Sequence, residues 1–200
     1  MYITNAKFTN LVGKYDYELT LREGVNILTE PNGTGKTLML RIMQSIVGGR
    51  TFHNLKSTYD EVAITMSDGR TLSTPIGDYG IVYLDEDRQV FRNNFEWCYA
   101  PSEDALAKFD YFGSDYIPNS FGGRNLKEII GTVECAPIGS IILLDLVEIG
   151  LHIEWQEMLV DILMEIAEKD DKQIILTTHS PNIVSDHFNL IIDKQITVRN

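Results

Sequence analysis

Two spacings of apolar residues alternate along the chain. Alternating or continuous apolar runs predict strands, and such runs lie at Tyr2–Phe8, Tyr15–Leu21, Val25–Leu28, Glu61–Met66, Thr71–Thr74, Gly80–Leu84, Ile141–Leu144, Gln173–Thr177 and Asn189–Ile192. Apolar residues three and four positions apart predict helices over Lys36–Val47, Leu126–Val133 and Trp155–Ile166. The segment Ser67–Arg70 is typical of a hairpin turn. Because strands and helices alternate in the second half, we expect an α/β fold with a mostly parallel sheet flanked by helices.

Length and composition favour one globular domain over residues 1–200. The chain is 44 % hydrophobic and 23 % charged, which is ordinary for a protein with its own core. No apolar run reaches the roughly 18 residues that a membrane span needs, and the first residues lack the features of a secretory signal. Cys98 and Cys135 are too few for a disulfide framework. We therefore expect a cytoplasmic protein with reduced cysteines.

The charge of the chain restricts its partners. It has 17 Lys and Arg residues against 29 Asp and Glu residues, a net charge of −12. Phosphate backbones repel a surface of this sign, and no basic run supplies a local groove. We therefore do not expect this chain to bind nucleic acid by itself.

A glycine-rich segment joins the third predicted strand to the first predicted helix. Residues 30–37 match the phosphate-loop pattern G-x-x-x-x-G-K-[ST] at every fixed position except the first, where Glu30 stands. In such a loop, glycines let backbone amides converge on phosphate oxygens, the lysine reaches the β- and γ-phosphates, and the hydroxyl holds Mg²⁺. The alternative is a glycine turn that only caps a helix. The predicted nucleotide-binding residues are Asn32, Gly33, Thr34, Gly35, Lys36 and Thr37.

Two polar residues follow later predicted strands. Asp145 ends the apolar run Ile141–Leu144, and His179 follows the run Gln173–Thr177 closely. Ligands of open α/β sheets bind at the carboxyl ends of the strands, and an acid at such an end can hold Mg²⁺ through water. Each residue alone is also compatible with a structural role. Their order after the phosphate loop favours a shared nucleotide site.

Together these segments resemble the ATP-binding-cassette (ABC) ATPases, in the branch of SMC, RecF and OLD-like proteins that includes prokaryotic AAA domains. The resemblance rests on Val25–Leu40, Ile142–His152 and Thr177–Pro181, in the correct order. It implies an ABC-type phosphate-loop fold with an N-terminal antiparallel β subdomain. It also implies ATP and Mg²⁺ as ligands, with Thr37 and Asp145 at the metal and His179 near the γ-phosphate.

The family also has a signature turn, a serine and two glycines that open a helix before the magnesium strand. Asn119–Arg124 occupies this position, although Phe121 separates the serine from the glycines. In the family this turn reaches the γ-phosphate held by the opposite subunit, a role that helix N-terminal amides suit. The resemblance therefore assigns Ser120, Gly122 and Gly123 to nucleotide binding. The alternative is an ordinary glycine turn before a helix.

Four positions depart from the family pattern or match it incompletely. Glu30 places a carboxylate where the first loop glycine stands, which weakens binding if the side chain faces the phosphates. Leu146 replaces the glutamate that polarises the attacking water, so we expect slow hydrolysis. Glu148 is the alternative catalytic base, although a structural role is favoured. Gln89 is the candidate for the magnesium-sensing glutamine, unless the acidic stretch around it is a solvated loop.

Residues 53–120 form an insert between the phosphate loop and the signature-like turn. The insert is too short for the coiled-coil arms of chromosome-organising relatives. Nine of the 19 aromatic residues lie between Phe91 and Phe121, a density that favours a small satellite core or a partner-binding face. Stacking on single-stranded bases needs interleaved cations, and residues 93–107 contain none.

Three hypotheses for function follow. The resemblance implies an ATP·Mg²⁺-binding head that dimerises on ATP, with itself or with a second chain, and controls a partner effector in DNA repair or phage defence. The second hypothesis is a non-hydrolysing, nucleotide-responsive scaffold for an effector. The third, the ATPase subunit of a transporter, suits the residues less well, because Pro181 after the histidine and the spacing from Gln89 to Ser120 favour the SMC-like branch.

Overall fold

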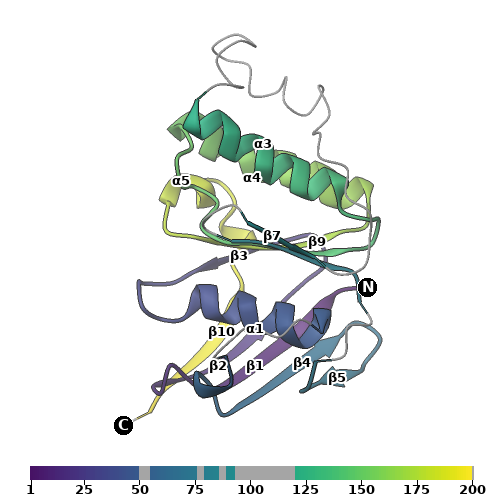
Figure 1. The fold of residues 1–200 in the computed structure, drawn as a ribbon. Helices are drawn as coiled ribbons and strands as arrows, with labels where there is room; N and C mark the ends of the chain where they lie inside the picture. Colours follow the sequence, from purple (N-terminus) through teal and green to yellow (C-terminus); the bar gives the residue numbers. More distant parts are fainter. Residues whose placement is uncertain (50–54, 76–78, 86–88, 93–119, 200) are drawn as a thin grey trace.

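A computed structural model of the chain describes residues 1–49, 55–75, 79–85, 89–92 and 120–199. In these residues two five-stranded sheets lie face to face with one helix, α1 (Lys36–Gly48), between them (Figure 1). Two longer helices, α3 (Phe121–Cys135) and α4 (Ile153–Lys169), cover the other face of one sheet. The layers therefore follow the order helices, sheet, helix, sheet.

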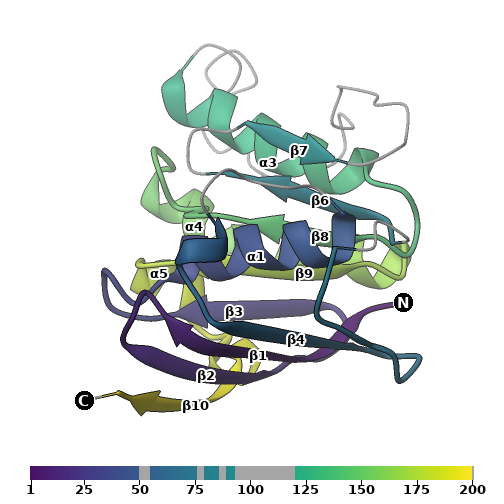
Figure 2. The same ribbon diagram turned by 60° about the horizontal axis from the view of Figure 1, so that its bottom comes forward.

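The antiparallel sheet brings together segments from both ends of the chain. Its strand order is β10-β2-β1-β4-β5. The strands are β1 (Ile3–Leu11), β2 (Tyr15–Thr20), β4 (Glu61–Met66), β5 (Thr71–Leu72) and β10 (Asp193–Val198). Strand β10 pairs with β2 at the edge of this sheet (Figure 2). A C-terminal strand therefore completes the predicted N-terminal subdomain.

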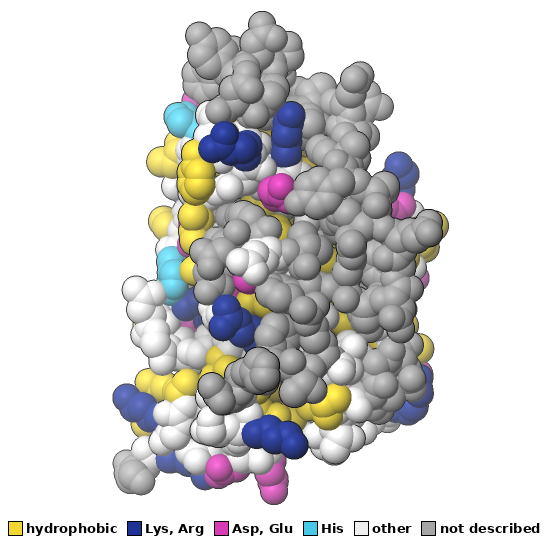
Figure 3. All heavy atoms as spheres, viewed as in Figure 1, with side chains coloured by type: hydrophobic (Ala, Val, Ile, Leu, Met, Phe, Trp, Pro, Cys, Tyr) yellow, Lys and Arg dark blue, Asp and Glu magenta, His cyan; other side chains and the backbone are white. Residues whose placement is uncertain are grey.

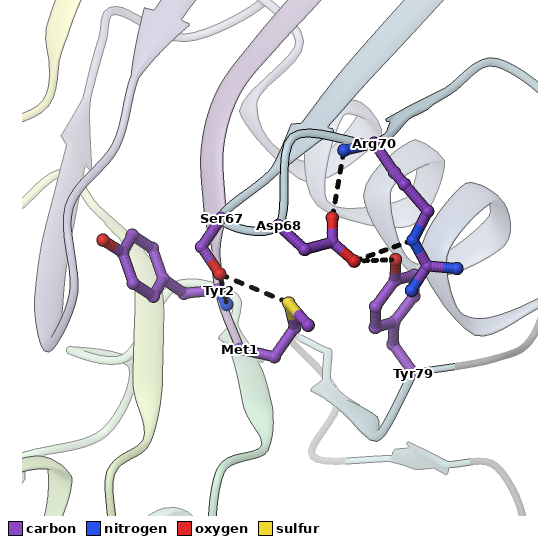
Figure 4. Close-up of polar contacts among 6 residues, drawn as sticks. All are labelled: Met1, Tyr2, Ser67, Asp68, Arg70 and Tyr79. Atoms are coloured by element: carbon purple, nitrogen blue, oxygen red, sulfur yellow. Dashed lines mark hydrogen bonds and ion pairs between the residues drawn. The ribbon is translucent and has the colours of Figure 1, made fainter.

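The predicted turn between β4 and β5 is confirmed, and Asp68 holds it together (Figure 4). The Asp68 carboxylate accepts hydrogen bonds from the Arg70 backbone amide at 3.0 Å, from Arg70 Nε at 2.7 Å and from the Tyr79 hydroxyl at 3.4 Å. These bonds, the backbone bond foremost, lower the pKa of Asp68. The Ser67 hydroxyl accepts a bond from the Tyr2 amide at 3.2 Å, which ties the turn to the start of β1.

The second sheet is parallel apart from one edge strand. Its order is β3-β9-β8-β6-β7, and only the β6–β7 pair is antiparallel. The strands are β3 (Val25–Thr29), β6 (Ile81–Leu84), β7 (Val90–Arg92), β8 (Ile141–Leu144) and β9 (Gln173–Thr178). Every residue of β6, β8 and β9 is buried. Burial on both faces explains why these strands are apolar runs without alternation.

Each face of the parallel sheet has its own apolar core. Helices α3 and α4 pack on one face through residues that include Leu126, Ile130, Leu159 and Leu163. Helix α1 and the antiparallel sheet close the other face through residues that include Met39, Ile42, Met43, Phe8 and Leu19. Within the described part of the chain, we find no helix with the length and apolar character that crossing a membrane requires.

The predicted strand at Asn189–Ile192 is wrong. Phe188–Leu190 forms a short 3₁₀ helix, and Ile191 makes only an isolated bridge to Ile27. The segment has the apolar residues typical of a strand, because Leu190 and Ile192 are buried in the core. The true terminal strand, β10, is an exposed edge strand, and such a strand lacks the apolar pattern on which the prediction relied.

Other elements differ in extent or were not predicted. Helix α3 begins at Phe121 instead of Leu126, and the sequence did not predict β7 or the short helix α5 (Pro181–Val184). Much of the aromatic-rich insert lies outside the described residues. This holds for Phe95, Trp97, Cys98, Tyr99, Phe109, Tyr111, Phe112 and Tyr116.

Candidate nucleotide-binding site

The carboxyl ends of three parallel strands carry the predicted site residues. Strand β3 leads into the phosphate loop, β8 into Asp145, and β9 into His179. A cavity of about 500 Å³ lies at this edge. It is lined by Val12, Asn32, Gly33, Gly35, Lys36, Thr37, Leu38, Arg41, Leu55, Thr58, Leu146 and His179. The phosphate loop, the end of β8 and the end of β9 therefore open on one space.

The phosphate loop has a backbone that depends on glycine. Gly33 and Gly35 have φ values of 80° and 96°. A Cβ at Gly35 would also lie 2.8 Å from Leu11 Cδ2, so both the backbone angle and the space require glycine there. Helix α1 starts directly after this residue, without a side-chain cap and without an acid in its first turn. The positive end of its dipole is therefore open to an anionic ligand.

Lys36 lies folded over the loop. Its side chain is buried, and its Nζ donates hydrogen bonds to the carbonyl oxygens of Glu30 at 2.6 Å and of Pro31 at 3.1 Å. Burial lowers the pKa of Lys36, and the nearby carboxylates of Glu30, Asp145 and Glu148 oppose that shift. The carbonyl partners are neutral, so phosphate oxygens would form stronger, charge-assisted bonds to the same amine. Thr34 adds a bond from its hydroxyl to the Pro31 carbonyl at 2.9 Å.

The Glu30 carboxylate has its ion-pair partner outside the lining of the phosphate cavity. It forms an ion pair with Lys194 of β10, its side chain is 8 % exposed, and it does not line the cavity. The ion pair with Lys194 therefore offsets the repulsion considered from the sequence. Sequence reasoning did not find Lys194, because no local pattern links a terminal edge strand to the loop.

Asp145 is fully buried at the end of β8. One carboxylate oxygen accepts a hydrogen bond from the Thr177 hydroxyl at 2.5 Å, and the other accepts one from the Tyr83 hydroxyl at 3.3 Å. Thr177 and Tyr83 were not predicted as site residues. Parallel alignment of the runs around Leu144 and Leu176 would have placed Thr177 beside Asp145.

Leu146 lines the cavity with His179, at the position where the family has its glutamate. Its φ is +47°, and its amide donates to the Thr177 hydroxyl at 2.9 Å. Glu148 does not line the cavity. Its carboxylate accepts hydrogen bonds from the Thr178 hydroxyl and from the His179 amide, both at 2.8 Å. These contacts fix the end of β9, as a structural role for Glu148 requires.

Gln89 lies at the turn between β6 and β7. Its side chain is exposed and is not part of the cavity lining. Its backbone amide donates to Asp85 Oδ1 at 2.7 Å, so the contact that the structure records is one of the turn. A role for Gln89 at Mg²⁺ stays a prediction.

The signature-like turn forms the N-terminus of α3. The Ser120 hydroxyl caps the helix by accepting the Gly123 amide at 2.9 Å, and Gly122 and Gly123 are buried. A Cβ at Gly122 would lie 2.3 Å from the Gly150 carbonyl oxygen, so close packing alone explains this glycine. None of Ser120, Gly122 and Gly123 lines the cavity of their own chain. Their role toward a second subunit stays a prediction.

Comparison with sequence families gives one partial match. The AAA ATPase domain family matches residues 112–184, a stretch that contains Asp145 and His179 but not the phosphate loop. No curated protein matches the chain by sequence.

Comparison with solved structures covers nearly the whole chain. An SMC head bound to the C-winged helix domain of ScpA aligns with a TM-score of 0.56 and 10 % identity, over 99 % of this chain and 98 % of that one. A dimeric structure of MJ0796, a bacterial ABC transporter cassette, aligns with a TM-score of 0.57 and 17 % identity, over 98 % and 99 %. This chain has the ABC-type ATPase fold. The ABC cassette MJ1267 in its ADP conformation also aligns, with a TM-score of 0.54 and 17 % identity, over 96 % and 90 %.

The ABC-type fold confirms the resemblance seen in the sequence. It includes the parallel sheet and the antiparallel sheet as the resemblance implied. With the phosphate loop at the end of β3, the chain shares the fold of the SMC head and of the ABC cassette.

Proposed function

We propose that the chain is an ATPase head that binds ATP with Mg²⁺, pairs with a second subunit when ATP is bound, and thereby controls a separate effector. The observation that carries the proposal is the single cavity on which the phosphate loop, Leu146 and His179 open. A site for a nucleoside triphosphate needs the residues that bind the phosphates, hold the metal and contact the reacting phosphate to meet at one sheet edge.

The donor groups present suit ATP and Mg²⁺. Lys36 and the first amides of α1 would hold the phosphates, with Asn32, Gly33, Thr34 and Gly35 shaping the loop around them. Thr37, which lines the cavity, would hold Mg²⁺ through its hydroxyl. Asp145, which is fully buried and not part of that lining, would hold it through water. Both offer oxygen, which Mg²⁺ prefers. When bound, the metal neutralises charge that develops on the β- and γ-phosphates.

Pairing of two subunits is supported by the surface beside the signature-like turn. Phe121 is 60 % exposed and Ile153 is 54 % exposed, and the Phe121 ring packs over Gly150. Figure 3 shows hydrophobic side chains along the left edge of the view. Exposed aromatic and aliphatic side chains beside a functional edge favour protein contact. The structure of MJ0796 is itself dimeric.

Slow hydrolysis is part of the proposal. Leu146 cannot accept a proton, and both Glu148 oxygens are engaged with β9. The same two observations favour the second candidate, a scaffold that binds ATP without hydrolysing it. In either case the output requires another protein, and the SMC head that aligns with this chain was solved with a partner domain bound. An effector in DNA repair or phage defence is supported by the family resemblance alone.

Light scattering with each nucleotide tests the proposal. ATP with Mg²⁺ should convert the protein into a compact dimer and ADP should not, because only the γ-phosphate can bridge to Ser120, Gly122 and Gly123 of the second subunit. Gly123→Asp should prevent the ATP-dependent dimer. An association state that ignores nucleotide would contradict the dimer proposal, and single-turnover ATPase measurement then separates a slow ATPase from a scaffold.

A further inference from the structure

The first residue of the phosphate loop is held from two sides. The Glu30 carbonyl oxygen accepts the hydrogen bond from Lys36 Nζ at 2.6 Å, while its carboxylate pairs with Lys194. Lys194 Nζ also donates to the carbonyl oxygen of Thr29 at 2.8 Å. One lysine thus binds both the end of β3 and the first side chain of the loop.

Lys194 reaches the loop from the far end of the sequence. It belongs to β10 and pairs with Leu19 of β2 (Figure 2). The strand is fixed at its other end as well, because Arg199 Nε contacts the Asp16 carboxylate at 2.8 Å and the Arg199 amide donates to the Lys14 carbonyl at 2.8 Å. A lysine on a strand held in this way is a rigid partner for Glu30.

A carboxylate at this loop position can weaken the binding of a triphosphate. Like charges at close range repel, and the repulsion grows where burial excludes water. A buried carboxylate that loses its partner is strongly destabilised, so it turns toward the nearest water. Lys36, whose Nζ bonds to the Glu30 carbonyl oxygen, lines the open cavity. Loss of Lys194 would therefore drive the Glu30 charge toward the phosphates.

We infer that Lys194 is a positioning residue of the nucleotide site, which keeps the Glu30 carboxylate out of the phosphate cavity. The inference rests on the proposed function, since it concerns ATP binding at this loop. It makes the terminal strand β10 part of the nucleotide site, and it explains how the chain tolerates glutamate at this loop position.

A set of charge variants tests the inference through equilibrium binding of a fluorescent ATP analogue. Lys194→Met keeps the length of the side chain and removes its charge. It should weaken binding about tenfold or more, because the nearly buried Glu30 carboxylate loses its cationic partner. Lys194→Arg should restore most of the affinity. The double variant Glu30→Gln with Lys194→Met should also restore it, since no carboxylate remains to repel phosphate.

A matched control removes an equal charge elsewhere on the same sheet. Lys7 pairs with Glu18 at 3.0 Å and is 55 % exposed, so Lys7→Met should leave the affinity unchanged. Glu30→Gln alone should bind the analogue as tightly as the wild type or more tightly, and this variant keeps the test valid if Lys194→Met does not fold.

The outcomes separate the inference from the proposed function. Wild-type protein that fails to bind the analogue contradicts the proposed function itself. Wild-type binding that Lys194→Met does not change overturns only the role of Lys194. A double variant that stays as weak as Lys194→Met overturns it as well, because Lys194 would then support the fold without acting through Glu30. Weaker binding by the single variant Glu30→Gln would also overturn the proposed role of Lys194.

Discussion

The phosphate loop and the loop between β8 and α4 border the same cavity but use their polar groups differently. In the phosphate loop, Lys36 bonds to the neutral carbonyl oxygens of Glu30 and Pro31, and among the described residues no side chain caps the start of α1. In the β8–α4 loop, the Glu148 carboxylate accepts from Thr178 and His179, and the Ile149 carbonyl accepts from Asn125 at 2.9 Å.

This difference between the two loops favours nucleotide binding and disfavours hydrolysis. In the phosphate loop, the Lys36 charge and the first amides of α1 are available to an anion. In the β8–α4 loop, the Glu148 carboxylate instead holds the end of β9. Leu146 lines the cavity, but its side chain has no carboxylate. We therefore expect a protein that binds ATP well and turns it over slowly.

The largest expected effect is the loss of binding in Lys36→Ala. Lys36 is the only cationic side chain of residues 30–37, so its removal leaves the β- and γ-phosphates without a cationic partner from the loop. Affinity for a fluorescent ATP analogue should fall about 100-fold or more, a change of about 3 kcal/mol. Equilibrium titration measures it, with Lys7→Ala as the control for net charge. Unchanged affinity would contradict the nucleotide site as a whole.

The next effect in size is a gain of turnover in Leu146→Glu. A carboxylate that orients water and takes its proton contributes typically about 10²–10⁴-fold, and position 146 lies on the cavity wall beside His179. Steady-state ATP hydrolysis should rise about tenfold or more. Leu146→Gln supplies a similar shape without a base and should stay slow.

Glu148→Gln completes this comparison of the two loops. It should change turnover little, because the Glu148 oxygens bond to β9 and do not line the cavity. Rapid hydrolysis by the wild type that disappears in Glu148→Gln would show instead that Glu148 moves to the phosphate and acts as the base.

The sequence predicted the first of these loops better than the second. The positions of Gly33, Gly35 and Lys36 follow from a local pattern, because the strand, turn and helix that shape the loop are contiguous in the chain. The bonds from Tyr83 and Thr177 to Asp145, and the pair of Lys194 with Glu30, join strands far apart in sequence. Such contacts depend on strand order and register, which apolar periodicity does not encode. The misplaced terminal strand has a different origin, because β10 is exposed and lacks an apolar pattern.

A third prediction concerns packing of the β8–α4 loop against α3. A Cβ at Gly122 would lie 2.3 Å from the Gly150 carbonyl oxygen, so Gly122→Ala should destabilise the fold by about 1–3 kcal/mol. Thermal unfolding without nucleotide measures the loss. At Gly80 a Cβ would make only an ordinary contact, at 3.6 Å from Ser140 Oγ, so Gly80→Ala should change the midpoint little. Equal midpoints for the two variants would mean that the β8–α4 loop is not held by this contact.

The smallest expected effect is on the pH dependence of ATP binding. Burial lowers the pKa of Lys36 from its ordinary 10.5, and phosphate binding requires the charged amine. Affinity for the analogue should therefore decrease as the pH rises through this lowered pKa. The effect on folding stability has the opposite sign. The unfolded chain keeps the Lys36 proton to a higher pH than the folded chain does. The contribution of Lys36 to the free energy of unfolding therefore increases over the same pH interval.

Lys36→Arg isolates this titration, because a guanidinium stays charged throughout the range. Affinity should be titrated from neutral pH up to the ordinary lysine pKa of 10.5, with the unfolding midpoint followed in parallel so that alkaline denaturation is recognised separately. The wild-type affinity should decline within this range while that of Lys36→Arg, whatever its absolute value, stays level. If both curves decline together, another group controls the alkaline limit, and the phosphate loop does not hold its lysine in the buried state that distinguishes it from the β8–α4 loop.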